Sequence, residues 1–313
     1  MAALVFVETD EGSVKKSSLE AVSYAKEAAG EAVAIVFGAV NDIETVGQAG
    51  ASKVLHVTDD KLSTPNIMAY SSAIAEAMNQ EGADLLVLAK SSLGDPVSAR
   101  VAIKVDAALA SNVSELPSGD SVKKSIYTGK AFANTSLEGS KRIISIKKNA
   151  VAVKEDGAAP EVVAFAPTTN DADFTVKTTK VEKAEGDILL PEADLVVSGG
   201  RGLKGPENWG MVEELAKTLG AATGCSKPVS DMDWRPHHEH VGQTGIKVSP
   251  SLYIAIGISG AIQHLAGVNS SKNILVINKD PEAPFFKAAD YGVVGDAFDV
   301  IPKLTEAIKK AQA

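Results

Sequence analysis

Short apolar runs alternate with amphipathic segments along the first third of the chain. Four runs have strand length and a nearly continuous apolar character: Leu4–Val7, Ala32–Phe37, Lys53–Val57 and Asp84–Ala89. Apolar residues between them recur at helical spacing, which predicts helices at Ser17–Ala29, Asp42–Ala49, Ser63–Gln80 and Asp95–Ala110. Apolar strands separated by helices indicate a parallel sheet that is covered on both faces.

The pattern changes between residues 112 and 187. Short β-type segments follow one another without long helices, at Lys124–Ala133, Ser136–Leu137, Arg142–Lys147, Val151–Asp156 and Val162–Ala166. The charged stretch Lys177–Asp187 contains glycine and almost no large apolar side chains, which is typical of a linker. We therefore predict an N-terminal α/β domain over residues 1–187, with a β-rich end.

A second α/β domain is predicted over residues 188–313. Apolar runs predict strands at Ala193–Ser198, Leu252–Ile256, Ile274–Ile277 and Tyr291–Val294. Periodic segments predict helices at Pro206–Leu219, Phe285–Ala288 and Asp299–Lys310. This alternation favours a Rossmann-like or flavodoxin-like fold.

Residues 241–267 combine three features within this second domain. A polar turn, Gly242–Gly245, precedes the strand Leu252–Ile256, and a second glycine turn, Gly257–Gly260, leads into a helical pattern that carries His264. A strand, a glycine turn and a helix start form an anion-binding device, because backbone N–H groups point outward there and the helix dipole favours phosphate. The stretch therefore predicts a cofactor site.

Composition and charge limit the classes of function that this chain can have. The 313 residues carry a net charge of -9 and show no basic stripe, which argues against nucleic acid as the main ligand. The only cysteine is Cys225, so a reducing compartment such as a bacterial cytoplasm is expected. The N-terminus has no basic segment before its apolar run, and no run approaches the ~20 residues of a membrane span. We expect a protein that is not membrane-inserted.

Residues 200–205 match the dinucleotide-binding pattern G-x-G-x-x-G. The expected helix starts at Pro206, after the glycines, and no acidic residue follows at the spacing that binds a ribose. A different phosphate-binding turn, with Arg201 as its charge, is therefore favoured over an NAD site, and a plain strand-to-helix turn remains the simpler alternative. Gly257–Gly260 resembles the hydrolase elbow G-x-S-x-G, but its second glycine comes one residue early.

Histidines occur in two places in the second domain. His237, His238 and His240 follow Pro236, with Glu239 among them. Metal binding is one interpretation of this cluster, but we favour a solvated loop, so that no metal site is predicted and their role stays open. His264 stands alone, but its position at the start of a helix after a glycine turn favours a functional role.

Several segments of the second domain together resemble the α subunit of electron transfer flavoprotein. They are SGGRG at 198–202, GCSKPVSD at 224–231, VGQTG at 241–245, LYIAIGISGAIQHLAG at 252–267 and INKDPEAPFFKAADYGVVGD at 277–296. The likeness of the first domain is weaker and rests on SSLGDP at 91–96.

The resemblance implies one FAD in the second domain and a β subunit that usually holds AMP, contacted by the first domain. It implies that FAD is bound by Arg201, Ser226, Lys227, Val241, Gly242, Gln243, Thr244, Ser259, Gly260, Ala261, Ile262, Gln263, His264, Asn278 and Asp296. Three of these, Lys227, Thr244 and His264, would tune the flavin. A donor or cation near the flavin's N1 and O2 stabilises its reduced forms. The family usually has arginine where this chain has Lys227, which lacks the planar fork of arginine.

The function that the resemblance implies is electron carriage by a heterodimer without its own substrate. Flavoprotein dehydrogenases, such as those that oxidise acyl-CoA in fatty acid β-oxidation, would donate electrons, and a membrane-bound quinone reductase would accept them. The first alternative is a subunit of an electron-bifurcating complex that oxidises NADH. The second is an NAD-dependent oxidoreductase that uses the 200–205 turn.

Overall fold

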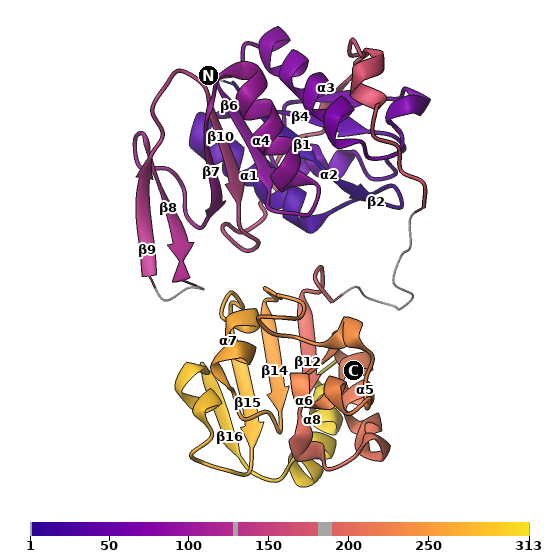
Figure 1. Ribbon diagram of the computed structural model, residues 1–313, viewed down its shortest axis with the longest axis vertical. Helices are drawn as coiled ribbons and strands as arrows, with labels where there is room; N and C mark the ends of the chain where they lie inside the picture. The colour runs from indigo at the N-terminus through magenta and orange to yellow at the C-terminus, as the bar shows by residue number, and fades with distance from the viewer. Residues whose placement is uncertain (1, 128–130, 181–189, 313) are drawn as a thin grey trace. The chain divides into compact units, whose positions relative to one another are not determined.

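The computed structural model describes residues 2–127, 131–180 and 190–312. Its contacts divide the chain into two compact units, Met1–Val181 and Glu182–Ala313, called unit 1 and unit 2 below (Figure 1). Within the described ranges, unit 1 contains a nine-stranded, mostly parallel sheet and unit 2 a five-stranded parallel sheet, which confirms the predicted α/β class. The predicted boundary after residue 187 lies outside the described residues and stays a prediction.

The sheet of unit 1 is built around the apolar N-terminal strand. Its order is β11-β5-β4-β1-β6-β10-β7-β8-β9, parallel from β11 to β7 and antiparallel over the last two pairings. The strands are β1 (Ala2–Val7), β4 (Glu31–Phe37), β5 (Lys53–Val57), β6 (Leu85–Ala89), β7 (Ala108–Val113), β8 (Ser121–Ile126), β9 (Ala131–Ser136), β10 (Arg142–Ile146) and β11 (Glu161–Ala164). A two-stranded sheet, β2 (Thr9–Asp10) and β3 (Ser13–Val14), stands apart.

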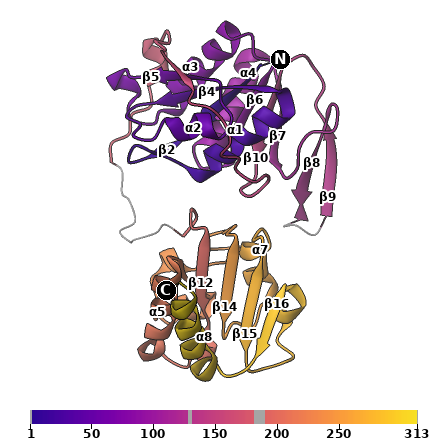
Figure 2. The same cartoon turned by 180° about the vertical axis from the view of Figure 1, so that it is seen from behind.

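Helices cover both faces of this sheet, as the continuous apolar strands predict. Leu4 and Phe6 of β1 pack in a core with α3 (Ile67–Gln80) and α4 (Gly94–Val105), whereas Val5 and Val7 point to the opposite core. That second core contains α1 (Lys16–Ala29) and α2 (Glu44–Gln48). The short helix η1 (Asp60–Leu62) joins the first core through Leu62. Figure 2 shows the helices around the sheet from behind.

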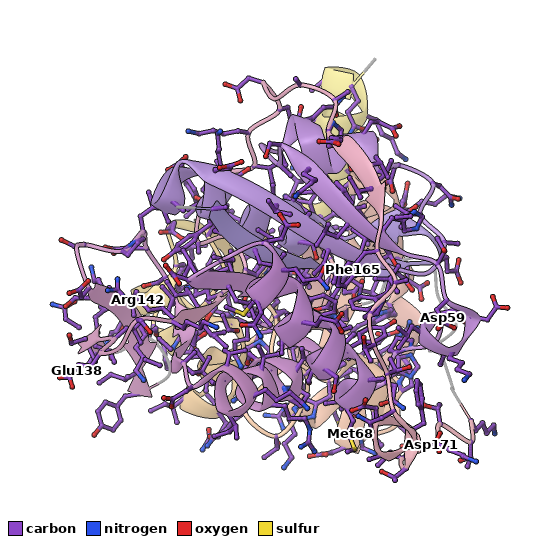
Figure 3. All side chains as sticks on the ribbon, turned by 90° about the horizontal axis from the view of Figure 1, so that it is seen from above. Asp59, Met68, Glu138, Arg142, Phe165 and Asp171 are labelled. Atoms are coloured by element: carbon purple, nitrogen blue, oxygen red, sulfur yellow. The ribbon has the colours of Figure 1, made fainter. Side chains whose placement is uncertain are left out.

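The short helix η3 (Asp171–Phe174) packs on α3. Figure 3 shows Met68 and Asp171 at the same corner of unit 1. Ser72 of α3 donates a 2.6 Å hydrogen bond to Asp173 of η3, and the Thr175 hydroxyl donates to the sulfur of Met68 at 3.7 Å. The segment that precedes the linker is thereby attached to the outer surface of a helix.

Three sequence predictions for unit 1 are wrong in detail. The helix expected over Asp95–Ala110 ends at Val105, because Asp106 adopts a left-handed conformation with φ of 52°, and Ala108–Val113 forms β7 instead. The segment Lys124–Ala133 is not one strand, because β8 and β9 pair as a hairpin within it. Val151–Asp156, expected to be a β segment, belongs to no strand.

The sheet of unit 2 has the order β13-β12-β14-β15-β16 and is parallel throughout. Its strands are β12 (Leu195–Gly199), β13 (Ala222–Cys225), β14 (Leu252–Ile256), β15 (Ile274–Asn278) and β16 (Tyr291–Val294). Its α-helices are α5 (Gly210–Leu219), α6 (Lys227–Asp231), α7 (Ile262–Val268) and α8 (Ala297–Gln312). Single turns of 3-10 helix occur at η4 (Arg201–Leu203), η5 (Pro206–Asn208), η6 (His237–Glu239) and η7 (Pro284–Ala288).

Each face of the second sheet has its own core. Val197, Ile254 and Ile277 pack with α5 and α8, which Figure 2 shows in front of the strands. Tyr253 and Ala255 of β14 point to the other face, where α7, η7 and residues 241–248 cover them. No helix in the described parts of the chain combines the length and the apolar character needed to cross a membrane.

Candidate functional site

The strand order of unit 2 places the candidate residues on one edge of its sheet. Numbered from its first strand, the order is 2-1-3-4-5, and it reverses between β12 and β14. Ligands of open parallel sheets bind outside the carboxyl ends of the strands, at such a reversal point. The residues singled out by the sequence lie at or after these ends: Arg201 after β12, Ser226 and Lys227 after β13, Val241–Thr244 in the connection between β13 and β14, Ser259–His264 after β14, Asn278 at the end of β15 and Asp296 after β16.

The two glycine turns at the reversal point touch through their backbones. Gly202 N–H donates to the Gly257 carbonyl at 3.0 Å, and a Cβ on Gly200 would lie 2.3 Å from the same oxygen. These glycines therefore allow the two loops to approach closely. The helix α5 begins at Gly210, beyond the last glycine of the 200–205 motif, so the motif does not form the helix N-terminus that a dinucleotide-binding turn requires.

The loop after β14 presents unpaired backbone donors. Within the described part of the chain, the N–H groups of residues 259–263 donate no hydrogen bond. The left-handed Gly260, with φ of 81°, faces Phe285, and a Cβ there would lie 2.4 Å from the Phe285 Cβ. A run of outward N–H groups on a glycine turn forms a concave anion-binding surface. The side chains of Ser259, Ala261, Ile262 and Gln263 are exposed around it.

The Gly242–Gly245 turn is fastened to this helix start. Gln243 N–H donates to the Gln263 carbonyl at 2.7 Å, and a Cβ on Gly267 would lie only 2.6 Å from Gly242 Cα. Val241 is buried and its N–H donates to the Cys225 carbonyl at 2.9 Å, whereas Gln243 and Thr244 are exposed. The structure thus brings together the two halves of the 241–267 stretch, which the strand β14 separates in sequence.

His264 is the buried polar group of this arrangement. The residue is 7% exposed, and its Nε2 lies 2.9 Å from the Tyr253 hydroxyl. Its Nδ1 is buried without a hydrogen-bond partner among the described residues. Burial, and then the neighbouring His240, lower the pKa of His264 from 6.5 to about 4, although the Val241 carbonyl acts in the opposite direction. A neutral imidazole with an unsatisfied buried nitrogen fits a ligand that supplies the missing partner.

Two exposed cations flank the site. Within the described residues, neither Arg201 nor Lys227 forms an ion pair, although acidic side chains outnumber basic ones in the whole sequence. Lys227 is the first residue of α6, and the buried Ser226 that precedes it donates its N–H to the Gly199 carbonyl at 3.0 Å. Unpaired cations beside unpaired N–H groups make this edge receptive to an anion.

Asn278 and Asp296 have local partners. Asn278 Nδ2 donates to the Ile258 carbonyl at 3.0 Å and so braces the loop after β14. An Asp296 carboxylate oxygen accepts from the Phe298 N–H at 3.0 Å at the start of α8. Both residues lie at the same sheet edge as the others, and their expected contact with the adenosine half of FAD stays a prediction.

The strand order of unit 1 also reverses, between β1 and β6, but hydrogen bonds within the chain already occupy polar groups at that point. The Ser91 hydroxyl donates to the buried Glu8 carboxylate and accepts from Gly94 N–H at 2.6 Å, which satisfies the start of α4. The start of α4 is therefore satisfied by the chain itself, whereas the N–H groups of residues 259–263 in unit 2 donate no hydrogen bond among the described residues.

Sequence reasoning missed two residues of the site. The sequence pattern predicts only a strand position for Tyr253 and a solvated loop for His240, yet Tyr253 is buried against His264 and His240 against the Gly242–Gly245 turn. The loop interpretation holds for the exposed His237 and His238 but is wrong for His240. The period of two along β14 could have placed Tyr253 on the face that α7 covers, while no signal distinguished His240. The described residues contain no cluster of three or more His, Cys, Asp or Glu side chains arranged for a metal ion.

Comparison with known proteins places this geometry in a family. Residues 189–269 match the family model of the electron transfer flavoprotein FAD-binding domain, and residues 3–170 match that of the electron transfer flavoprotein domain. The chain is 40% identical to electron transfer flavoprotein subunit alpha of Syntrophomonas wolfei, with 98% of each chain covered. It is 35% identical to that of Bacillus subtilis, covering 98% of this chain and 97% of the relative.

A relative from Caenorhabditis elegans, named as a probable mitochondrial electron transfer flavoprotein subunit alpha, is 36% identical and covers 97% of this chain and 93% of its own length. Similarity therefore extends over both units rather than over the site alone. By family model and by near full-length identity, the chain belongs to the electron transfer flavoprotein family, in the group of its α subunits.

Proposed function

We propose that this chain is the FAD-binding subunit of a heterodimeric electron carrier with one FAD. It accepts electrons from flavoprotein dehydrogenases, such as acyl-CoA dehydrogenases, and passes them to a membrane-bound quinone reductase. Its partner is a β subunit that holds AMP, and it works in a reducing compartment such as a bacterial cytoplasm. Family membership supports the carrier role, and the geometry of unit 2 supports the cofactor.

The observation that carries the proposal is the orphaned Nδ1 of His264 beside the unpaired N–H groups of residues 259–263. FAD combines an anionic pyrophosphate with a ring that carries hydrogen-bond acceptors. The N–H groups suit the pyrophosphate, and the buried Nδ1 suits a ring acceptor. One ligand thus satisfies both unusual features of the site.

The remaining residues have roles that follow from their charge and place. Arg201 would neutralise phosphate, and Ser226, Val241 and Gly242–Thr244 would line the ring. Asn278 and Asp296 would face the adenosine half. Bound FAD supplies the electron chemistry, while the protein binds, orients and tunes it.

His264 would tune the reduction potential of the cofactor through a single hydrogen bond that it donates. If the Tyr253 hydroxyl donates to Nε2, the neutral ring carries its proton on Nδ1 and donates it outward. A donor in a dry site is worth more than one in water when negative charge develops beside it. The same burial keeps the ring neutral, because it lowers the pKa of His264. Lys227 would add a positive point charge beside the flavin ring.

The decisive experiment is co-expression with the neighbouring subunit, followed by an absorption spectrum and a nucleotide count. A yellow complex with one FAD and one AMP is expected. Two flavins per complex would instead indicate the electron-bifurcating type. A colourless complex that binds NADH would refute the proposal in favour of the NAD-dependent alternative, although the start of α5 at Gly210 speaks against that outcome.

A further inference from the structure

His240 differs from the other histidines of its segment in being buried. Its side chain and backbone are 8% exposed, whereas His237 and His238 are exposed. It forms a parallel bridge with Cys225, at the carboxyl end of β13, so it lies at the functional edge of the sheet. Its backbone is therefore paired with the end of a strand of the sheet.

The imidazole of His240 lies directly against the Gly242–Gly245 turn. A Cβ on Gly245 would lie 2.7 Å from His240 Nδ1, and a Cβ on Gly242 would lie 3.3 Å from His240 Nε2. The His240 carbonyl also accepts the Ile246 N–H at 2.7 Å, which closes the turn. Both glycines of the turn thus leave room for this ring, and the ring in turn limits where the turn can lie.

Several titratable groups surround His240. From α6, Lys227 disfavours its protonated form and Asp231 favours it, while His237 of η6 also disfavours it. On β13, burial raises the pKa of the Cys225 thiol to about 12, so that neighbour is uncharged near neutral pH. Burial first, and then Lys227, lower the pKa of His240.

The last neighbour is His264 of α7, whose own pKa His240 helps to lower. The His240 ring and the His264 backbone both lie close to Gly242: a Cβ there would be 3.3 Å from His240 Nε2 and 3.7 Å from His264 Cα. A proton on one ring therefore disfavours a proton on the other, so each ring favours the neutral form of its neighbour.

We propose that His240 is a positioning residue of the flavin site, which holds the Gly242–Gly245 turn in place and takes up a proton when negative charge develops on the flavin. This inference rests on the proposed function and extends it by a second histidine. The proton comes from solvent and stays on the imidazole, and the electrons come from the donor flavoprotein. A group that binds a proton more tightly when the cofactor is reduced couples proton uptake to reduction. By linkage, such a group makes the reduction potential of the cofactor rise as the pH falls.

The test compares three variants of the FAD-loaded complex with the wild-type complex. His240→Ala removes the ring from under the turn, and His240→Gln keeps a polar side chain that cannot titrate. His238→Gln is the matched control, because it removes an exposed imidazole two residues away. Dissociation constants for FAD are measured by titration into the flavin-depleted complex. Reduction potentials are measured with dithionite between about pH 8 and pH 5.5, a range that includes the ordinary pKa of histidine.

We expect His240→Ala to weaken FAD binding about tenfold, the effect of losing one modest contact, and His240→Gln to restore it. In the wild-type complex the potential should rise more steeply toward low pH than in His240→Gln, with His238→Gln matching the wild type. Unchanged FAD affinity in His240→Ala, or an unchanged pH profile in His240→Gln, overturns the inference. A wild-type complex that binds no flavin would instead refute the proposed function itself.

Discussion

The buried neutral state of His264 makes a quantitative prediction for the flavin-free chain. Its pKa falls from 6.5 to about 4 on folding. Well above pH 6.5 neither the folded nor the unfolded chain holds the proton, so the group has no effect on stability there. As the pH falls toward 4, the unfolded chain takes up a proton that the folded chain refuses, and folding stability decreases. At 1.36 kcal/mol per pKa unit, the decrease between pH 7 and pH 4 is about 3 kcal/mol.

The variant His264→Gln isolates this contribution. Glutamine retains a polar group for the Tyr253 hydroxyl but cannot titrate, so the variant should lack this part of the acid destabilisation. The difference in free energy of unfolding between wild type and variant is followed by urea titration at several pH values. Trp209 and Trp234 are the only tryptophans of the chain and both belong to unit 2, so their fluorescence reports this unit alone.

The wild type should lose stability relative to His264→Gln as the pH decreases below about 6.5. Ionisable groups that do not interact with His264 titrate alike in both proteins and cancel in the difference. Bound FAD should reduce the effect, because an acceptor at Nδ1 favours the protonated ring. A difference that stays constant from pH 7 to pH 4.5 would show that His264 is not held neutral by burial.

Three further predictions concern the same site. Gly267→Ala should destabilise unit 2 by about 1–3 kcal/mol and weaken FAD binding, because its Cβ would lie 2.6 Å from Gly242 Cα. The control is Gly210→Ala, whose Cβ would meet nothing within 4 Å, and equal urea midpoints for the two variants would contradict the close contact. Arg201→Ala should raise the FAD dissociation constant about tenfold or more with little change in unfolding, and tight FAD binding in this variant would exclude a phosphate role. Lys227→Arg should shift the reduction potential while FAD is retained; a potential equal to that of the wild type would place the Lys227 ammonium away from the ring.

The fold was predictable where the chain itself carries the periodicity. Strands such as β1 and β14 are buried apolar runs, and their alternation with helices indicated parallel sheets. The secondary-structure prediction failed where the residues are small and their pattern does not distinguish a helix from a strand. Ala107–Ala110 extends a helical pattern in the sequence, but Asp106 ends the helix and β10 recruits the following residues into the sheet. Only the tertiary contact decides between those two outcomes.

The candidate site was predictable for a similar reason. Its donors are contiguous in the sequence, since one glycine turn and one helix start supply them. His240 and Tyr253 were not identified because their importance comes from contacts between elements. His240 lies against a turn that follows it, and Tyr253 of β14 meets His264 of the following helix α7 over a separation of 11 residues. Residue type alone could not distinguish His240 from the exposed His238 two positions earlier.

The contact between Gly242 and Gly267 has a consequence for how the site works. The turn that would face the redox end of the flavin and the helix start that would hold its pyrophosphate touch backbone to backbone, and Gln243 N–H also binds the Gln263 carbonyl. A displacement of the turn must therefore move the start of α7 and with it His264. The binding of FAD and the tuning of its reduction potential are for this reason mechanically coupled. Substitutions beneath the turn should change affinity and potential together, whereas substitutions at exposed Arg201 should change affinity alone.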